Sequence, residues 1–210
     1  SLAARTVVEY SETKPVLSID DSLALVGGPL HGTDNLFAAH TIVKGDPDAA
    51  FARASAVFEE QFSTGAQEHV YLEPQGCVAV PEGGRMTIHV STQSPFYVRK
   101  AVAHVLGWPR ERVRVAVPEV GGGFGGKEHY PDVLATAAAV AALKTGRPVR
   151  IVLDRAEDMR VTCKRHPSRI RFRTALDDQG SVIGMEIDTV PDAGAYETCS
   201  PIVLQRALFT

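Results

Sequence analysis

Short segments rich in apolar and β-branched residues recur along the chain, and in some of them these residues alternate with polar ones, as is typical of strands. The segments with this pattern are Arg5–Tyr10, Phe37–Lys44, Ala56–Phe62, Cys77–Val80, Met86–Val90, Arg112–Val117, Val149–Leu153, Ser168–Leu176 and Val182–Val190. Two pairs of these segments are separated only by Pro81–Gly84 and by Asp177–Gly180, whose glycines and polar residues indicate turns. The pattern therefore predicts two hairpins.

Capping residues, helical spacing of apolar residues in Pro95–Leu106, and a run that is apolar nearly all round in Pro131–Lys144 predict helices between these strands. The predicted helices are a short one at Asp20–Ser22 that ends before Gly27, Gly45–Ala54, Pro95–Leu106, Pro131–Lys144, and one that begins at Pro201–Leu208. Asp46 suits the N-cap of the second helix with Pro47 at its first position, and Gly107 suits the C-cap of the third. Because hairpins and strand–helix units are interleaved, the sequence predicts an α+β fold with mixed and antiparallel sheets and packed helices.

Composition narrows the possible functions. The formal net charge of −3 gives neither the basic footprint of a nucleic-acid-binding protein nor a polybasic membrane patch. The cysteines Cys77, Cys163 and Cys199 lie far apart, so the chain supplies neither an iron–sulfur cluster nor a structural zinc site, and they fit a reducing compartment. The apolar run Val133–Leu143 has about half the length that a bilayer requires. Since the sequence starts at Ser1, we expect a piece of a longer polypeptide.

The densest cluster of glycines is the stretch Val120–Glu128, with the sequence Val-Gly-Gly-Gly-Phe-Gly-Gly-Lys-Glu, between a predicted strand and a predicted helix. Glycine has no Cβ, so such a backbone adopts left-handed angles, lets a ligand come close and points amide N–H groups at an anion. A flexible linker is the weaker interpretation, because Gly/Ser linkers do not usually join a strand to a helix in this way. The stretch therefore predicts a functional loop.

Three chemistries are open for this loop. Its glycines match the G-x-G-x-x-G of dinucleotide folds, with Asp154 after the next strand as a ribose-binding carboxylate, although that acid comes later than usual. The run Gly121–Lys127 also matches the phosphate-binding G-x-x-x-x-G-K, but Glu128 stands where a Ser or Thr would reach magnesium. In the third chemistry the loop brings amides close to a metal-bound oxo group and presents Glu128 to a substrate.

Nine short motifs are found in order along most of the chain. They are Gly65–Glu73, Ser91–Gln93, Ala103–Gly107, Gly121–Glu128, Lys144–Arg150, Leu153–Met159, Arg165–Pro167, Asp192–Tyr196 and Arg206–Phe209. In these motifs the chain resembles the large, molybdopterin-binding portion of the xanthine dehydrogenase / aldehyde oxidase family of molybdenum hydroxylases. The resemblance implies that residues 1–35 end an α/β hammerhead-like domain and its connection. It also implies that residues 36–210 are the N-terminal, truncated part of the molybdopterin-binding domain.

The resemblance assigns roles to four residues. Gln67 matches a glutamine that hydrogen-bonds an oxo ligand on molybdenum, a task that suits an amide because it donates without adding charge. Phe124 and Gly125 match residues that approach the molybdenum centre mainly through backbone groups, and the Phe124 ring is expected to pack. Glu128 matches the carboxylate with which purine-hydroxylating members bind the heterocycle. Without the resemblance, Gln67 would be interpreted as an ordinary turn residue.

The family's reaction, as the resemblance implies it, is a hydroxylation with oxygen from water at a Mo-molybdopterin centre. Iron–sulfur clusters and FAD are expected on other domains or subunits, with a small N-heterocyclic substrate and a cytoplasmic, oligomeric full-length enzyme. The catalytic base lies downstream in the family, so no catalytic residue and no direct metal ligand is expected within this chain. The chain alone is expected to be inactive. The metal-binding residue types at Glu68, His69, Glu73 and His129 are not expected to form a mononuclear site.

Several alternatives stay open. Glu128 favours a purine over an aldehyde, but the departures at Glu73–Gly76 and Tyr130–Pro131 from the animal-type pattern leave another N-heterocycle, such as nicotinate, as a possible substrate. An aldehyde hydroxylase is a further alternative within the family. A nucleotide-binding module or a scaffold without catalysis is the alternative from another class of protein.

Overall fold

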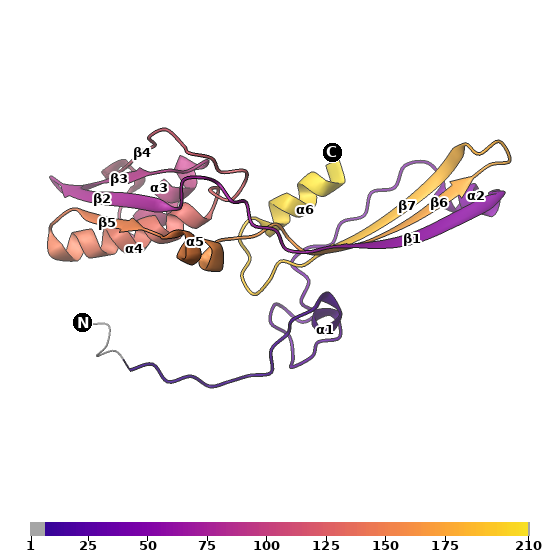
Figure 1. The fold of residues 1–210 in the computed structure, drawn as a ribbon, viewed down its shortest axis with the longest axis horizontal. Coiled ribbons are helices and arrows are strands. Elements are labelled where there is room, and N and C mark those ends of the chain that lie inside the picture. The colour runs from indigo at the N-terminus through magenta and orange to yellow at the C-terminus, as the bar shows by residue number, and fades with distance from the viewer. Residues whose placement is uncertain (1–6, 210) are drawn as a thin grey trace. The chain divides into compact units, whose positions relative to one another are not determined.

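The computed structural model describes residues 7–209, which form two compact units (Figure 1). The continuous segment Gly65–His166 is one of them, and we call it the core unit. The other, which we call the sheet unit, contains the described residues up to Thr64 and those from Pro167 onwards. The core unit is therefore inserted within the sequence of the sheet unit.

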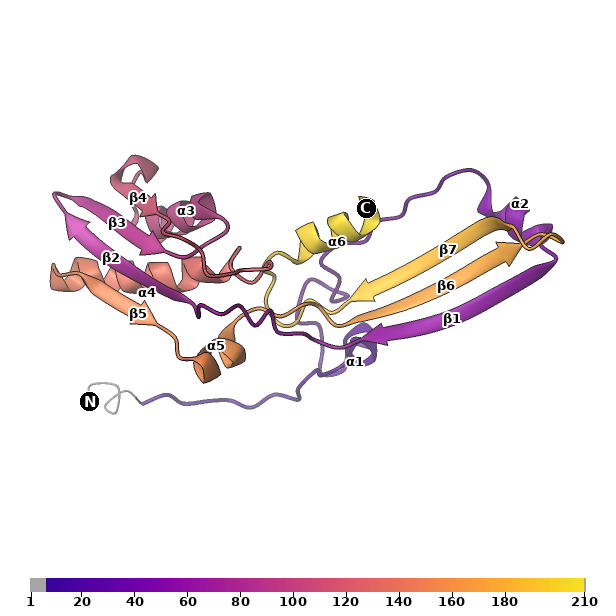
Figure 2. The ribbon, with the colours of Figure 1, turned by 45° about the horizontal axis from the view of Figure 1, so that its top comes forward.

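The core unit is built on a four-stranded mixed sheet. Its strands are β2 (Gly76–Glu82), β3 (Arg85–Val90), β4 (Val113–Ala116) and β5 (Val149–Val152), in the order β4-β3-β2-β5. β2 is antiparallel to both of its neighbours, whereas β3 and β4 are parallel. The helices α3 (Pro95–Leu106) and α4 (Tyr130–Thr145) pack against each other and against this sheet (Figure 2). A short 3-10 turn, η2 (Arg110–Arg112), and the helix α5 (Arg155–Val161) complete the unit.

The hydrophobic core of this unit lies between its sheet and its two long helices. Alternate residues of the hairpin are buried, because successive side chains of a strand point to opposite faces. The buried strand residues are Cys77, Ala79, Met86, Ile88, Val90 and Val113. The helix α4 adds four fully buried alanines at Ala135, Ala138, Ala139 and Ala142. Small side chains on that face let α4 lie close to the sheet.

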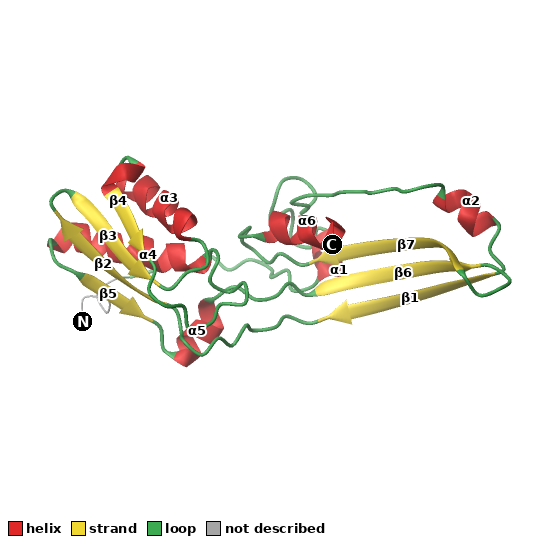
Figure 3. Ribbon diagram, turned by 90° about the horizontal axis from the view of Figure 1, so that it is seen from above, coloured by secondary structure: helices red, strands yellow, loops and turns green. Residues whose placement is uncertain are grey.

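The sheet unit contains a three-stranded antiparallel sheet. Its strands are β1 (Ala56–Thr64), β6 (Ser168–Leu176) and β7 (Val182–Pro191), in the order β1-β6-β7, and Figure 3 shows them side by side. The helices are α1 (Ile19–Leu23), α2 (Pro47–Ala52) and α6 (Ser200–Phe209). Thr64 at the end of β1 lies opposite Ser168 at the start of β6. The core unit is thus an insertion between two paired strands.

The two faces of the three-stranded sheet differ in character. On one face, Arg173 lies between Glu59 and Glu186 on the neighbouring strands and forms ion pairs with both. The helix α2 covers the far end of that face, where Ala50 is buried and a Cβ on Gly184 would come within 2.9 Å of the Ala50 Cβ. The opposite face is apolar and half exposed. Its most exposed large residues are Phe58, Phe62, Met185 and Ile187.

Most predicted elements are confirmed. Both hairpins form, Asp46 caps α2 with its side chain, and Gly107 ends α3 in the left-handed conformation with φ of 64°. The first helix is capped by Ser18, whose side chain accepts a hydrogen bond from the Asp21 N–H, so this helix begins slightly before the predicted Asp20. The α+β fold class, with one mixed and one antiparallel sheet, is confirmed.

Two predicted strands are wrong. The segment Phe37–Lys44 is extended but belongs to no strand, and the same holds for residues 7–10 of the predicted Arg5–Tyr10 strand, whose first two residues lie outside the described part of the chain. Alternation and β-branched residues are not sufficient for a strand, because the backbone also needs a partner for its hydrogen bonds. The helix α5 was not predicted at all, although Asp154 caps it by accepting a hydrogen bond of 2.8 Å from the Glu157 N–H.

The sheet order rules out the dinucleotide arrangement. In that fold the strand before the glycine loop and the strand after the following helix lie side by side. Here β4 and β5 occupy the two edges of the sheet, with β3 and β2 between them. Asp154, the candidate ribose carboxylate, is instead the N-cap of α5. Among residues 7–209, no helix combines the length and the apolar character that a membrane crossing requires.

Candidate functional site

The glycine loop, residues 121–126, lies between β4 and α4 and takes a conformation that only such a sequence allows. Gly122 and Gly125 have φ of 95° and 94°, in the left-handed region where a Cβ is strained. Phe124 also has a positive φ, of 52°, which is uncommon for a residue with a side chain. Its ring is 73% exposed, so the expectation that it packs is wrong in this structure.

Neighbouring side chains leave no room for side chains at the other glycines of this loop. A Cβ at Gly121 would lie 2.5 Å from the Glu73 Cβ, and one at Gly123 would lie 2.5 Å from Oε1 of Gln93. At Gly126 an added Cβ would come within 2.8 Å of both His69 and Tyr71. Since such contacts do not occur between real atoms, these three glycines are required by close packing rather than by backbone angles.

An ion pair between a buried lysine and a partly exposed glutamate joins the loop to the segment that precedes β2. The Lys127 side chain is fully buried, and its Nζ lies 2.8 Å from Oε2 of Glu73 and 3.2 Å from Oγ of Ser91. The ammonium group also lies 4.6 Å from the centre of the Tyr71 ring, a cation–π contact. A buried charge is tolerated only when it is paired in this way.

The Glu73 carboxylate is the centre of this cluster. The same Oε2 accepts hydrogen bonds of 2.6 Å from Ser91 Oγ and 2.8 Å from the Gly121 N–H. Burial alone would raise the pKa of Glu73, but the hydrogen bonds from Lys127, Ser91 and Gly121 outweigh it and lower the pKa. A lowered pKa means that the carboxylate stabilises the fold at neutral pH, and that this contribution is lost as the pH falls through the folded-state pKa.

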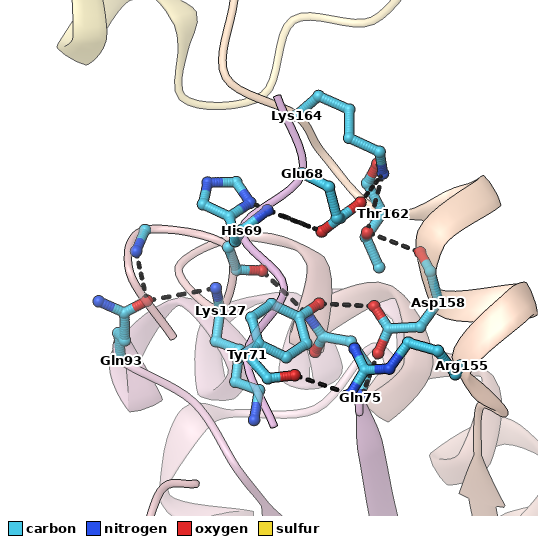
Figure 4. A network of polar contacts seen from close by, with 12 residues as sticks. Glu68, His69, Tyr71, Gln75, Gln93, Lys127, Arg155, Asp158, Thr162 and Lys164 are labelled. Atoms are coloured by element: carbon cyan, nitrogen blue, oxygen red, sulfur yellow. Dashed lines mark hydrogen bonds and ion pairs between the residues drawn. The ribbon is translucent and has the colours of Figure 1, made fainter. Parts of the chain in front are cut away.

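The motif Ser91–Gln93 holds Lys127 at its main chain as well. Gln93 Oε1 accepts hydrogen bonds from the N–H groups of Gly125, at 3.0 Å, and Lys127, at 3.2 Å (Figure 4). The Lys127 carbonyl accepts from Thr92 Oγ1 at 3.0 Å and from the Gln93 N–H at 2.9 Å. The N–H, the carbonyl and the side chain of Lys127 are therefore all fixed by three consecutive residues at the end of β3.

A second polar network lies beneath the loop and connects it to α5 (Figure 4). The Tyr71 hydroxyl donates to Asp158 at 2.7 Å, and the Gln75 N–H donates to the other oxygen of Asp158 at 2.6 Å. The Gln75 side-chain amide donates to the Tyr71 oxygen and to the Gly126 carbonyl, both at 2.9 Å. Burial, followed by the hydrogen bond to Asp158, raises the pKa of Tyr71 well above its usual range. The tyrosine is thus a permanent donor.

The segment that carries Gln67 lies beside the glycine loop. His69 packs against Gly126 and, through Nε2, faces Gly125, where an added Cβ would lie 3.7 Å away. Glu68 forms an ion pair of 2.7 Å with Lys164. Burial alone would raise the pKa of Glu68, but hydrogen bonds from Lys164 and the His69 N–H lower it. The backbone of Gln67 bridges to Arg165, and the residue itself is exposed.

The structure therefore brings three of the four predicted site residues into one region. Phe124 and Gly125 form the outer turn of the loop, and Glu128 follows directly after the buried Lys127 and is half-buried. Gln67 stands two residues before His69, which touches the loop. The roles of these residues towards a cofactor stay predictions.

Sequence reasoning missed the residues that support the loop. Glu73, Gln93 and Lys127 all lie within the nine ordered motifs, but nothing in the spacing indicated that they meet. The position of Lys127 directly after the glycine loop was a signal. A lysine beside a tightly packed loop is buried only when a partner compensates its charge. The described residues contain no group of three metal-binding side chains, and Glu68 and Glu73 are directed to lysines.

The loop fits a large group that is contacted through main-chain atoms. Five of its six positions are glycine, so its outer surface carries no side chain except that of Phe124. An edge of exposed backbone is where a bulky cofactor can approach amide groups closely. The rest of the loop is held from below by Glu73, Gln93 and Tyr71, which leaves the outer side open for a ligand.

Comparisons with known proteins place the chain in one family. Residues 30–210 match the family described as the molybdopterin cofactor-binding domain. Xanthine dehydrogenase/oxidase of Rattus norvegicus is 39% identical over 210 residues, which is 99% of this chain and 15% of the rat protein. Xanthine dehydrogenase of Emericella nidulans is 37% identical over 209 residues, which is 98% of this chain and 15% of the fungal protein.

A solved structure agrees with these relatives. Quinoline 2-oxidoreductase from Pseudomonas putida 86 matches 90% of this chain and 24% of its own, with a TM-score of 0.75 and 30% identity. The chain belongs to the molybdopterin cofactor-binding domain family, and the resemblance to molybdenum hydroxylases of the xanthine dehydrogenase type is confirmed. It spans only about a seventh of the rat relative, as its 15% coverage states.

Proposed function

We propose that the complete protein is a xanthine dehydrogenase-like molybdenum hydroxylase that oxidises a purine-type N-heterocycle with oxygen from water. The observation that carries this proposal is the similarity to xanthine dehydrogenases along 99% of the chain, together with a glycine loop whose outer side is open main chain. The electrons leave through iron–sulfur clusters and FAD on other domains or subunits of a cytoplasmic, oligomeric enzyme. The boundary between hammerhead-like and molybdopterin-binding parts stays at residue 35 in this proposal.

The molybdopterin-bound molybdenum supplies the redox chemistry and activates the oxygen that is transferred. The residues of this chain would bind the cofactor and the substrate and orient them. Gln67 would hold the molybdenum centre with its side-chain amide as a hydrogen-bond donor, and Phe124 and Gly125 would hold it through their main-chain groups. Glu128 accepts hydrogen bonds from the N–H groups of the heterocycle. Buried polar contacts of this kind discriminate strongly between substrates, because a wrong substrate leaves them unpaired.

The test uses the full-length protein purified with its partners. We expect about one molybdenum per chain, and oxidation of at least one purine in a panel that also contains pyridines, quinolines and aldehydes. Glu128→Gln is expected to lower kcat/KM for the purine by about tenfold to 150-fold, the usual value of a hydrogen bond to a charged group. Glu119→Gln, an exposed change in the same loop region, is the control. A mature preparation without molybdenum contradicts the proposal and favours a scaffold or a nucleotide-binding module.

A second substrate class within the same family is favoured by one observation. The solved structure with a TM-score of 0.75 is named for quinoline, a ring that carries no N–H group in its neutral form. If quinolines or pyridines are oxidised and purines are not, Glu128 has another role than the one proposed. The same substrate panel therefore decides between the two classes.

A further inference from the structure

The glycine loop is closed at both ends by one ion pair, in which the lysine is buried and the glutamate side chain is 40% exposed. At the first end, the Glu73 carboxylate accepts from the Gly121 N–H at 2.8 Å, and the Glu73 N–H donates to the Gly121 carbonyl at 3.2 Å. At the other end, the same carboxylate oxygen contacts Lys127 Nζ at 2.8 Å. The two residues that flank Gly122–Gly126 are therefore tied to a single side chain from the segment before β2.

This arrangement holds the strained part of the loop in place. Phe124 occupies a left-handed conformation that is unfavourable for an L-residue, so the surroundings must impose it. Gln93, which accepts from the Gly125 and Lys127 N–H groups, fixes the main chain on the C-terminal side of Phe124. If Lys127 were released, both the ion pair and the register of these two N–H groups would be lost.

Lys127 cannot contact a ligand itself. Its side chain is 0% exposed, and its Nζ is enclosed by Glu73, Ser91 and the Tyr71 ring. An apolar residue could fill such a buried position without the desolvation of a charge, so a buried lysine is poor evidence for stability alone. A charged pair that reaches both ends of a strained loop instead specifies one conformation of that loop.

We propose that Glu73 and Lys127 are a positioning pair that sets the backbone of Phe124 and Gly125 at the molybdenum centre. The inference rests on the proposed function, because it concerns the site that the loop would form there. The pair influences the molybdenum centre by holding the loop. Its loss changes the geometry of the centre and the rate of the chemical step more than it changes substrate affinity.

The test compares variants of the full-length enzyme. Lys127→Met removes the buried charge and leaves the partly exposed Glu73 carboxylate without its cation, whereas the double variant Glu73→Gln/Lys127→Met removes both charges. Removing one partner of such a pair costs more than replacing both, so the double variant keeps the fold if the single one does not. Lys100→Met, an exposed lysine on α3, is the matched control.

The first readout is hydrogen–deuterium exchange of the peptide that covers residues 119–129, which does not depend on activity. We expect exchange in this peptide to be at least about tenfold faster in the double variant than in the control, since a loop held by tertiary hydrogen bonds exchanges only when it opens. Unchanged exchange overturns the inference, because the pair would then not hold the loop.

The second readout is the molybdenum centre. With molybdenum content within about twofold of wild type, we expect an altered electron paramagnetic resonance spectrum of the reduced metal and kcat lowered about tenfold or more, with KM within about threefold. If the loop exchanges faster but the spectrum and kcat equal those of the wild type, the inference is also overturned, because the pair would then affect only the fold. A wild-type enzyme without molybdenum refutes the proposed function instead, and the exchange experiment still decides whether the pair holds the loop.

Discussion

The two units of this chain bury their apolar residues to very different extents. The core unit encloses a continuous cluster that includes Met86, Ile88 and Val98, all of them 0% exposed. In the sheet unit, the buried apolar residues among the described ones are Ala50 and Ala175, and every residue of β1 is exposed. A sheet needs a covered apolar face to be stable by itself. The glycine loop, which carries the candidate site, belongs to the unit that has its own core.

The largest effect is expected when the two units are expressed separately. Residues 65–166 expressed alone are expected to unfold in one cooperative transition, because the cluster between sheet and helices is complete within that segment. Residues 7–64 joined to 167–209 by a Gly/Ser linker are expected to show no cooperative transition. Circular dichroism during urea unfolding measures both. A cooperative transition in the second protein would show that the difference in burial does not decide whether a unit folds by itself.

A matched pair of substitutions, one in each unit, tests whether the difference in burial is reflected in stability. Ile88→Ala in β3 removes a fully buried side chain and is expected to lower the free energy of unfolding by about 2–5 kcal/mol. Ile187→Ala in β7, where the side chain is 55% exposed, is expected to cost about 1 kcal/mol or less. Urea unfolding followed by circular dichroism compares them, and the single tryptophan, Trp108, reports on the core unit alone. Equal effects would contradict the comparison.

The hydroxyl of Tyr71 offers a smaller test. Tyr71→Phe removes the hydrogen bond of 2.7 Å to Asp158 and is expected to cost about 1–3 kcal/mol, because it leaves a buried carboxylate oxygen without this donor. Tyr196→Phe is the control in the sheet unit, where the side chain is 82% exposed and the expected change is within about 0.5 kcal/mol. Thermal unfolding measures both variants. Equal midpoints would contradict a stabilising role for the hydrogen bond between Tyr71 and Asp158.

The smallest effect concerns thiol reactivity. Burial raises the pKa of Cys77 to about 11, so almost none of it is thiolate at pH 8. Cys199, in the sheet unit, is only half-buried. A short pulse of iodoacetamide on the native chain is expected to label Cys77 at least about tenfold more slowly than Cys199. Mass spectrometry of the tryptic peptides measures the rates, and similar rates would indicate that the core unit opens readily.

Local patterns predicted the elements better than their pairing. The two hairpins, the capped helix after Asp46 and the helix that ends at Gly107 each depend on residues that are close in sequence. The segment Phe37–Lys44 is also rich in apolar and β-branched residues but is not a strand, because no neighbouring strand pairs with it in the described chain. Backbone hydrogen bonds are made between segments, so a pattern within one segment cannot guarantee them.

The sequence by itself determined the family, the α+β class and the loop that carries the candidate site, since glycine content and ordered motifs are properties of the chain alone. Tertiary structure decided which residues support that loop. Glu73 and Lys127 are 54 positions apart, and only the packing of the segment before β2 against the loop brings their charges within 2.8 Å. The same packing decides that Gly121, Gly123 and Gly126 must be glycine, because the atoms that exclude a Cβ come from distant parts of the sequence.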